Sequence, residues 1–407
     1  MLTVKSVDEV MRVIEDSFSG YYLEAEITGI SEALGRITAE DVAACEDVPE
    51  FNRSSVDGYA VIASDTYGCS DSIPAQLEFS GEVDMGARYA GTVAKGKTVY
   101  VPTGGELPEG ADAVVMIEYA DDPGDGYIYM NKPAAPGNNV VYKGDDIKAG
   151  NAAIKPGTRL RAQDIGVLAA LGMDMLSVKK RIRVGIISTG DELVDIRVKP
   201  TGSQVRDINS HSLSAGLLAY GAEPVMYGIV RDDYADIRNA VDIALAECDV
   251  VMISGGSSVG FKDETLKVIN SFGAPGALVH GIAVKPGKPT IIGKVRGKAV
   301  VGLPGHPASA FMIFHVFVHR LLDVLNNTNS EYRSTVKAVV AHNYPSNTGR
   351  EELLPVKLNY ADNRIYACPV FGKSGLISLL SSADGYIRIG RSTEGLASGE
   401  AAEVILF

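Results

Sequence analysis

The chain has 407 residues, and because a single hydrophobic core rarely grows beyond about 250 residues, this length predicts two to four domains. Hydrophobic residues make up 46% of the chain, which is enough to fill such cores. Acidic residues outnumber basic ones by 51 to 38, and the net charge is −13. Since no basic patch interrupts this excess, the composition argues against a nucleic-acid partner.

Cysteine spacing and hydropathy give the expected compartment. The cysteines are far apart, so neither a CxxC metal site nor a redox pair is predicted, and reduced thiols in a cytosol are the simplest interpretation: Cys45, Cys69, Cys248, Cys368. No unbroken apolar run reaches the roughly 18 residues of a membrane helix, and the N-terminus lacks the order of a signal peptide. We therefore expect a cytoplasmic protein that has no membrane contact.

The first half of the chain predicts one helix followed by a β-rich region. Ser6 and Glu9 have the spacing of a capping box, and apolar residues recur at helical spacing over 6–19. Short apolar runs separated by Gly, Pro and Asp fill 27–148, which predicts strands with long loops. A short helix over 163–172 follows and ends at Gly172.

From residue 180 strands and helices alternate. Strands are predicted at 183–187, 224–230, 250–253, 290–292 and 299–301, and helices at 209–220, 234–246, 263–272 and 307–325. This alternation predicts a mostly parallel α/β sheet over 180–325, whose ligands bind at the carboxyl ends of the strands. The segment from 330 to the end returns to strand-like runs and predicts a small β-barrel or sandwich.

Three loops follow predicted strands of this α/β segment. The loop at 254–260 is rich in Gly and Ser and leads towards a helix, an arrangement that favours anion binding. The loops at 188–192 and 302–307 follow two further strands and would reach the same edge of the sheet. Each loop alone is equally consistent with a tight turn and a helix cap. Together with Asp191, Glu192 and Asp263, they predict a cleft for a phosphate and a metal ion.

A basic turn lies between the Gly/Ser loop at 254–260 and the loop at 302–307. Lys285 and Lys288 flank a Pro-Gly turn in the sequence KPGKP. Such a turn can direct both ammonium groups to one point, which suits a tetrahedral oxyanion or a phosphate, although a solvated basic turn is the alternative.

A series of motifs occurs in fixed order between residues 49 and 307: PEFNRSSVDGYA at 49–60, PTGG at 102–105, GADAVV at 110–115, GDDI at 144–147, STGDEL at 188–193, the Gly/Ser loop with Asp263, KPGKP at 285–289 and PGHP at 304–307. Their type and order resemble those of the molybdopterin molybdenumtransferase (molybdenum insertase) family, which includes the insertase domain of gephyrin. Because the motifs and their flanks cover essentially the whole chain, the resemblance is highly specific.

This resemblance implies a multidomain fold of α/β and β parts in an elongated homodimer. Its parts are a mixed N-terminal domain (1–26 with 149–179), an inserted β-rich domain (27–148), a mostly parallel molybdopterin-binding α/β domain (180–326) and a C-terminal β-barrel (327–407). The active cleft of such proteins lies between the α/β domain of one subunit and the β-rich domain of the other. The implied partners are a molybdopterin adenylyltransferase and the recipient molybdoenzymes or tungstoenzymes.

The resemblance also implies the reaction, which is insertion of molybdate or tungstate into adenylylated molybdopterin with Mg²⁺-dependent release of AMP. Carboxylates that hold Mg²⁺ and amides that hold a phosphate suit cleavage of an adenylate. The implied catalytic and metal-binding residues are Asp57, Asp146, Glu192 and Asp263. The implied cofactor-binding residues are Thr103, Ser188, Thr189, Gly190, Ser254, Gly255, Gly256, Ser257, Pro304, Gly305 and Pro307. The implied molybdate-binding residues are Lys285, Lys288, Arg350 and Ser374.

Some residues depart from the family pattern or allow another interpretation. Asn52 replaces the usual Asp and removes a possible acidic ligand, Ser257 stands where Val is common, and His306 replaces Asn in the PGNP turn. Asp57 also suits an Asp-Gly hairpin turn. His315 and His319 are one helical turn apart, but their apolar and aromatic neighbours favour packing over a zinc site.

Two other functions stay open. A non-catalytic molybdopterin-binding or scaffolding protein would share the fold, although the complete set of four acids disfavours it. A molybdopterin adenylyltransferase would share the α/β domain alone, which makes the full architecture hard to explain.

Overall fold

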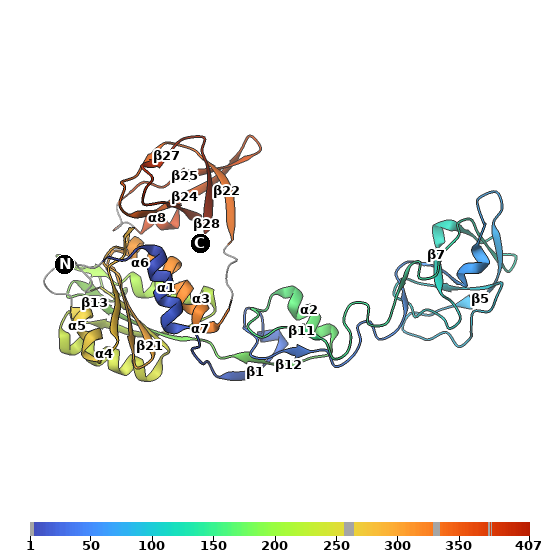
Figure 1. The fold of residues 1–407 in the computed structure, drawn as a ribbon, viewed down its shortest axis with the longest axis horizontal. Coiled ribbons are helices and arrows are strands. Elements are labelled where there is room, and N and C mark those ends of the chain that lie inside the picture. Colours follow the sequence, from blue (N-terminus) through green and yellow to red (C-terminus); the bar gives the residue numbers. More distant parts are fainter. Residues whose placement is uncertain (1–3, 256–263, 329–333, 373–374, 376) are drawn as a thin grey trace.

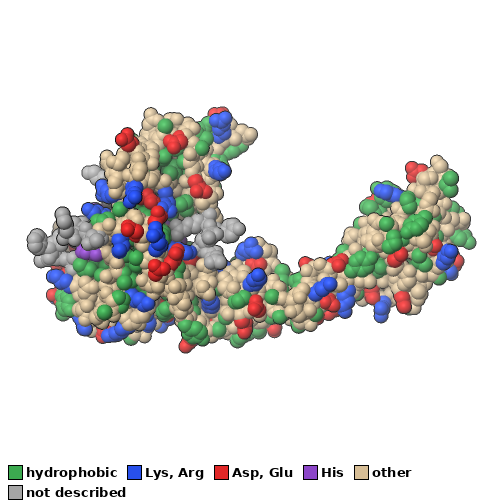
Figure 2. All heavy atoms as spheres, in the orientation of Figure 1, with side chains coloured by type: hydrophobic (Ala, Val, Ile, Leu, Met, Phe, Trp, Pro, Cys, Tyr) green, Lys and Arg blue, Asp and Glu red, His purple; other side chains and the backbone are tan. Residues whose placement is uncertain are grey.

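The computed structural model describes residues 4–255, 264–328, 334–372, 375 and 377–407. These residues form an elongated molecule (Figure 1). The α/β domain lies at one end with the C-terminal β domain beside it, a small domain lies in the middle, and the β-rich domain lies at the far end. On the face drawn in Figure 2, acidic and basic side chains are interspersed along the molecule.

A mostly parallel sheet forms the centre of the α/β domain, as predicted. Its strand order is β16-β13-β17-β21-β20-β18, and the first four strands are mutually parallel. Strand β20 runs antiparallel to β21, and the short edge strand β18, which the sequence analysis missed, pairs antiparallel with β20. The strands are β13 (Arg183–Thr189), β16 (Glu223–Val230), β17 (Val250–Ser254), β18 (Gly276–His280), β20 (Ile291–Val295) and β21 (Lys298–Leu303).

Helices cover both faces of this sheet. One core cluster joins the sheet to α4 and α5, and a larger one joins it to α3, α6 and α7. The strands are buried on both sides, which explains their unbroken apolar runs. The helices are α3 (Asn209–Tyr220), α4 (Tyr234–Glu247), α5 (Glu264–Ser271), α6 (Pro307–Ile313) and α7 (His319–Asn326), with a π-helical turn η4 (Phe314–Val318) between the last two.

The helical stretch Pro307–Asn326 is long and apolar. By length and composition alone it could cross a membrane, with a mean hydropathy of 1.5 in its 18-residue window. However, 72% of that window is buried inside the chain. Its side chains belong to the larger core cluster of the α/β domain.

Helix α1 (Val7–Phe18) lies in a different domain from the one predicted. Ser6 and Glu9 form the expected capping box. Val10, Ile14 and Phe18 belong to the larger core cluster of the α/β domain, and the helix packs against α7 and β18. The assignment of 1–26 to the small domain is therefore wrong for this helix, because its apolar stripe is buried against a domain that follows 160 residues later.

The small domain starts where the β-rich domain was expected. Strand β1 pairs with β12 in an antiparallel ladder, and Val42 shares a core with Leu160 and Leu168. Residues 25–44 therefore lie with 150–179, and the predicted boundary at residue 27 is too early. The elements are β1 (Ala25–Gly29), η1 (Ile30–Glu32), β2 (Val42–Ala43), β11 (Ala152–Ile154), α2 (Ala162–Ala170) and β12 (Met175–Lys179).

The β-rich domain is inserted into the small domain through two adjacent chain segments. Val48 and Ile147 form an isolated β-bridge between these segments, which Figure 1 shows running side by side. The main sheet of the domain has the order β7-β4-β6-β5-β9-β8. Its elements are β3 (Arg53–Ser54), β4 (Gly58–Val61), η2 (Ala63–Thr66), β5 (Ala75–Glu82), β6 (Lys97–Val101), β7 (Ala113–Met116), η3 (Ile117–Tyr119), β8 (Ala120–Asp121), β9 (Tyr127–Met130) and β10 (Val140–Val141).

The C-terminal strands close into a barrel, the first of the two predicted possibilities. They pair in the ring β24-β25-β22-β28-β26, and β26 pairs back with β24. The α/β domain adds β19 (Val284–Lys285) parallel to β24. The other elements are β22 (Thr335–Val340), β23 (Tyr344–Pro345), β24 (Glu351–Ala361), β25 (Arg364–Pro369), α8 (Ser378–Ser381), β26 (Gly385–Ile389), β27 (Gly395–Leu396) and β28 (Ala401–Leu406).

Candidate active site

Three loops meet at the carboxyl edge of the parallel sheet, as their position after neighbouring strands predicted. We refer to residues 188–190, 254–255 and 304–305 as the strand-end cluster. Strands β13, β17 and β21 are adjacent in the sheet, so the loops that follow them start side by side. Ser188, Thr189 and Ser254 are almost fully buried. The described part of the cluster is therefore a packed structure and not a set of independent turns.

The cluster requires a glycine at position 255. Its φ is +108°, and an added Cβ would lie 2.1 Å from the backbone oxygen of Thr189. The backbone of the β17 loop thus lies directly against the backbone of the β13 loop. A Cβ added to Gly305 would lie 3.8 Å from the Cα of Gly255, so the third loop is also in van der Waals range of the second. Close backbone packing of this kind leaves little side chain between the main chain and a ligand.

Asn209, the first residue of α3, connects two of these loops. Its Nδ2 donates to the Oγ of Ser254 at 2.7 Å and to the backbone oxygen of Gly305 at 2.9 Å. Asp207 accepts from the backbone N–H of Ser210 at 3.1 Å and fixes the start of the same helix. This group was not predicted, although Asp207, Asn209 and Ser210 at the start of a helix could have indicated it.

Several polar atoms of this region are buried and have no hydrogen-bond partner among the residues that the structure describes. They are Ser188 Oγ, Thr189 Oγ1, Asn209 Oδ1 and Ser210 Oγ. Buried polar atoms are normally satisfied, so a group of them in one place is unusual. It is typical of a region that completes its hydrogen bonds with a ligand or an ordered water.

Glu192 lies beside this cluster. A Cβ added to Gly190 would lie 2.8 Å from one carboxylate oxygen of Glu192, so the carboxylate lies over the end of the β13 loop. Both Asp191 and Glu192 are exposed. The structure thus places one predicted acid at the edge of the cluster. Gly256, Ser257 and Asp263 fall outside the described residues.

The two acids of the β-rich domain are on exposed loops. Asp57 Oδ1 accepts a hydrogen bond of 2.7 Å from the backbone N–H of Thr103. Asp146 is exposed, and its own backbone N–H donates to the Val48 oxygen at 3.1 Å. Asn52 Oδ1 accepts from the Lys143 N–H at 2.9 Å, so this departure from the family pattern has a structural role.

One chain does not bring together the three predicted acids that the structure describes. Asp57 and Asp146 belong to the β-rich domain, whereas Glu192 belongs to the α/β domain at the other end of the molecule (Figure 1). Among the described residues, no three His, Cys, Asp or Glu side chains form a group that could hold a metal ion. Carboxylates suit Mg²⁺, and the acids predicted to hold it come from both ends of the molecule.

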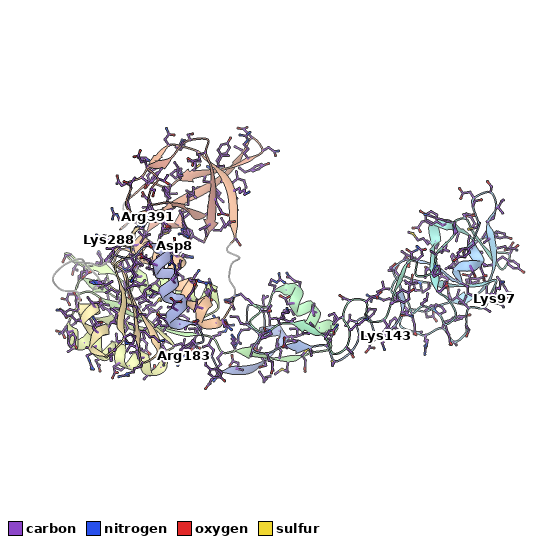
Figure 3. All side chains as sticks on the ribbon, viewed as in Figure 1. Asp8, Lys97, Lys143, Arg183, Lys288 and Arg391 are labelled. Atoms are coloured by element: carbon purple, nitrogen blue, oxygen red, sulfur yellow. The ribbon has the colours of Figure 1, made fainter. Side chains whose placement is uncertain are left out.

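The lysines of the KPGKP turn lie at the junction between the α/β domain and the barrel. Lys285 pairs with Glu352 across the β19–β24 ladder. The N–H of Glu351 donates to the oxygen of Ala283 at 2.9 Å, which brings Arg350 to the same junction. Figure 3 labels Lys288 in the α/β domain, on the side of the barrel. Ser374 is outside the described residues.

Lys285 has an ionic partner that the sequence analysis did not predict. Its Nζ lies 2.7 Å from Glu352 Oε1, and the Glu352 side chain is only 6% exposed. Burial raises the pKa of the Glu352 carboxyl, but hydrogen bonds from Lys285, Ser346 and Tyr344 lower it by more, so this pKa lies below its ordinary value. Glu352 is therefore ionised at neutral pH.

The histidines agree with the non-metal interpretation. The rings of His315 and His319 are 4.7 Å apart, and they pack against Phe311 and Phe314 with centroid distances of 4.3 and 4.7 Å. These contacts are those of ordinary helix packing. His306 is exposed at the N-cap of α6.

Comparison with protein families gives matches to three models in succession along the chain. The MoeA N-terminal region (domain I and II) matches residues 5–172, a probable molybdopterin-binding domain matches 185–323, and the MoeA C-terminal region (domain IV) matches 337–407.

Individual relatives match over nearly their whole length. A putative molybdopterin biosynthesis protein of Methanocaldococcus jannaschii is 31% identical over 100% of this chain and 98% of its own. A molybdopterin molybdenumtransferase of Bacillus subtilis is 28% identical over 94% of this chain and 90% of its own. A crystal structure of a molybdopterin biosynthesis MoeA protein from Pyrococcus horikoshii OT3 covers 100% of both chains, with a TM-score of 0.86 and 31% identity.

Proposed function

The chain belongs to the MoeA family of molybdopterin molybdenumtransferases, which act in molybdenum cofactor biosynthesis, and we propose that it inserts molybdate or tungstate into adenylylated molybdopterin and releases AMP. The observation that supports this most directly is the strand-end cluster. Three loops converge there with their backbones in contact, and Asn209 connects two of them. This arrangement suits a ligand that carries a phosphate.

The cluster would hold the adenylylated pterin. Ser188–Gly190, Ser254–Ser257 and Pro304–Pro307 supply small side chains and backbone amides, and Thr103 would contribute from the β-rich domain. Helix α6 begins at Pro307, directly after the third loop, so its positive end faces the same edge of the sheet.

The metal site would be shared between two copies of the chain. Glu192 and Asp263 of one copy would meet Asp57 and Asp146 of the other, because the β-rich domain lies too far from the α/β domain of its own chain (Figure 1). Thr103 fixes one oxygen of Asp57, and the other oxygen has no partner among the described residues. A bound Mg²⁺ would neutralise the charge on the adenylate phosphate. The homodimer is therefore part of the proposal.

The oxyanion would bind at the junction with the barrel. Molybdate and tungstate are doubly charged and tetrahedral, so they require cations and hydroxyl groups. Lys285, Lys288, Arg350 and Ser374 provide both kinds of group. The reaction would take place in the cytoplasm, between a molybdopterin adenylyltransferase and the recipient molybdoenzymes or tungstoenzymes.

The test is AMP release by the purified chain. We expect AMP from adenylylated molybdopterin only when Mg²⁺ and an oxyanion are both present, and titration of molybdate against tungstate gives the preferred anion. AMP release that does not respond to either oxyanion would contradict the proposal. ATP consumption with bare molybdopterin would indicate an adenylyltransferase. Full cellular molybdoenzyme activity with Asp57→Ala would indicate a non-catalytic binding protein.

A further inference from the structure

A buried carboxylate lies beside one lysine of the proposed oxyanion site. Glu352 accepts hydrogen bonds from Lys285 Nζ at 2.7 Å, Tyr344 OH at 2.8 Å and Ser346 Oγ at 2.5 Å. The first two reach Oε1, and the third reaches Oε2. Both carboxylate oxygens are thus occupied, so the carboxylate has a fixed position.

Three parts of the chain hold this carboxylate in place. Glu352 belongs to β24, Tyr344 and Ser346 come from β23 and the residue after it, and Lys285 comes from β19 of the α/β domain. The parallel β19–β24 ladder places Lys285 directly opposite Glu352. The position of the lysine is therefore set by the junction between the two domains and not by its own flexible side chain.

The ion pair leaves part of the lysine available. The Lys285 side chain is 45% exposed, whereas that of Glu352 is 6% exposed. An ammonium group has three N–H donors, and the contact with Glu352 uses one of them. The other two can bind an oxyanion. Lys288 is half-buried and has no ionic partner among the described residues.

We propose that Glu352 is a positioning residue of the oxyanion site, which fixes the ammonium group of Lys285 and offsets its charge so that a dianion binds reversibly. This inference rests on the proposed function, because it takes the lysine pair as the oxyanion site. A lysine without this partner would bind a dianion more tightly. Insertion requires the anion to leave the lysines for the dithiolene, so very tight binding would retain the substrate.

Two variants of Glu352 should change the affinity in opposite directions. Glu352→Gln keeps the shape and an acceptor oxygen but removes a negative charge close to the dianion, so molybdate should bind about tenfold more tightly. Glu352→Asp keeps the charge but withdraws the carboxylate from Lys285 by one methylene. The ammonium group is then less well fixed, and molybdate should bind about threefold more weakly. A purely structural role would not produce opposite signs.

Glu351 provides a matched control on the same strand. It binds Arg388 at 2.5 Å within the barrel, and no contact joins it to Lys285 among the described residues. Glu351→Gln therefore removes the same charge from the neighbouring position without touching the lysine. Its affinity for molybdate should be within about twofold of the wild-type value.

The experiment is equilibrium binding of molybdate to the full-length chain, together with the KM values for molybdate and for adenylylated molybdopterin. Glu352→Gln should lower the KM for molybdate and leave the KM for the pterin unchanged. Unchanged or weaker molybdate binding by a folded Glu352→Gln protein would overturn the proposal. If Glu352→Gln does not fold, binding by Glu352→Asp that equals or exceeds wild type would overturn it.

Lys285→Ala separates this inference from the function on which it rests. If that variant binds molybdate like wild type, the oxyanion site is wrong and the role of Glu352 is wrong with it. If Lys285→Ala loses binding while both Glu352 variants bind like wild type, only the positioning role is wrong.

Discussion

The α/β domain and the β-rich domain hold their functional groups in different ways. In the α/β domain, Ser188, Ser254 and Asn209 are buried, and contacts between loops fix them. In the β-rich domain, Asp57 and Asp146 are exposed, and the Asp57 carboxylate accepts a hydrogen bond from the backbone amide of Thr103. In the proposed function, the first domain supplies a preformed binding surface, whereas the acids of the second act only against the surface of another copy. The acids of the second domain thus make few side-chain contacts with the described part of their own chain, which suits the proposed site shared between copies.

The largest effect on turnover is expected for variants of the proposed metal-binding acids, which test whether these acids act across two chains. Asp57→Ala and Glu192→Ala should each lower turnover by about 100-fold or more, because each removes a group that stabilises developing charge. If the site is shared, coexpression of the two variants should restore roughly a quarter of wild-type activity, since half of the dimers are mixed and each mixed dimer has one intact site. AMP release by the separated mixed dimer measures this directly. A mixed dimer as inactive as the single variants would show that each chain uses its own acids.

The next largest effect, on stability and pterin binding, is expected for a glycine variant that tests whether the strand-end cluster is tightly packed. Gly255→Ala places a Cβ 2.1 Å from the Thr189 oxygen at a φ of +108°. It should lower the free energy of unfolding by roughly 3 kcal/mol and abolish pterin binding. Gly273→Ala is the control, because its φ is +98° but nothing lies within 4 Å of the added Cβ. That variant should cost only about 1 kcal/mol and bind the pterin normally. Equal unfolding midpoints for the two variants would contradict this description of the cluster.

A smaller effect concerns the connection made by Asn209. Asn209→Ala removes two hydrogen bonds and should lower the free energy of unfolding by about 1–3 kcal/mol, with weaker binding of the adenylylated pterin. Ser212→Ala is the comparison, since its Oγ only donates to the backbone oxygen of Asn209 at 3.1 Å. Denaturant unfolding and pterin titration of both variants give the measurement. Pterin affinity that is unchanged in Asn209→Ala would show that the two loops keep their positions without this side chain.

The smallest effect is the pH dependence due to Glu352. Its pKa is lower in the folded chain than the ordinary value of 4.5, so the unfolded state binds the proton more readily. The resulting stabilisation is complete above the ordinary pKa and is lost as pH falls through the lower folded pKa. Wild type should lose about 1 kcal/mol more than Glu352→Gln between neutral pH and about pH 3. Parallel pH profiles of unfolding for the two proteins would mean that the ion pair contributes nothing to stability.

The sequence predicted the α/β domain well because its signals are local. Unbroken apolar runs and helix caps indicated β13, β17 and α3 to within about two residues. The strand-end loops could also be located, because parallel topology alone brings them to one edge. Strand β18 was missed, since it is short, begins at Gly276 and pairs only at the edge of the sheet.

The errors come from contacts between distant parts of the chain. The capping box indicated helix α1 correctly, but no local pattern shows that its apolar face packs against α7. The role of Glu352 could not be predicted either, because its burial and its pairing with Lys285 exist only once the barrel adjoins the α/β domain. Asn209 was missed for the same reason, as its partners lie 45 and 96 residues further along the chain.

The position of helix α1 has a consequence for the order in which the chain can fold. Glu15 forms an ion pair with Arg320, 305 residues away. During synthesis α1 therefore leaves the ribosome long before its binding surface exists, and its apolar stripe is exposed while the small domain and the β-rich domain are made. Docking of α1 closes a very long loop, so we expect it to be a late step in folding. The first helix to be synthesised would thus be among the last elements to reach its native position.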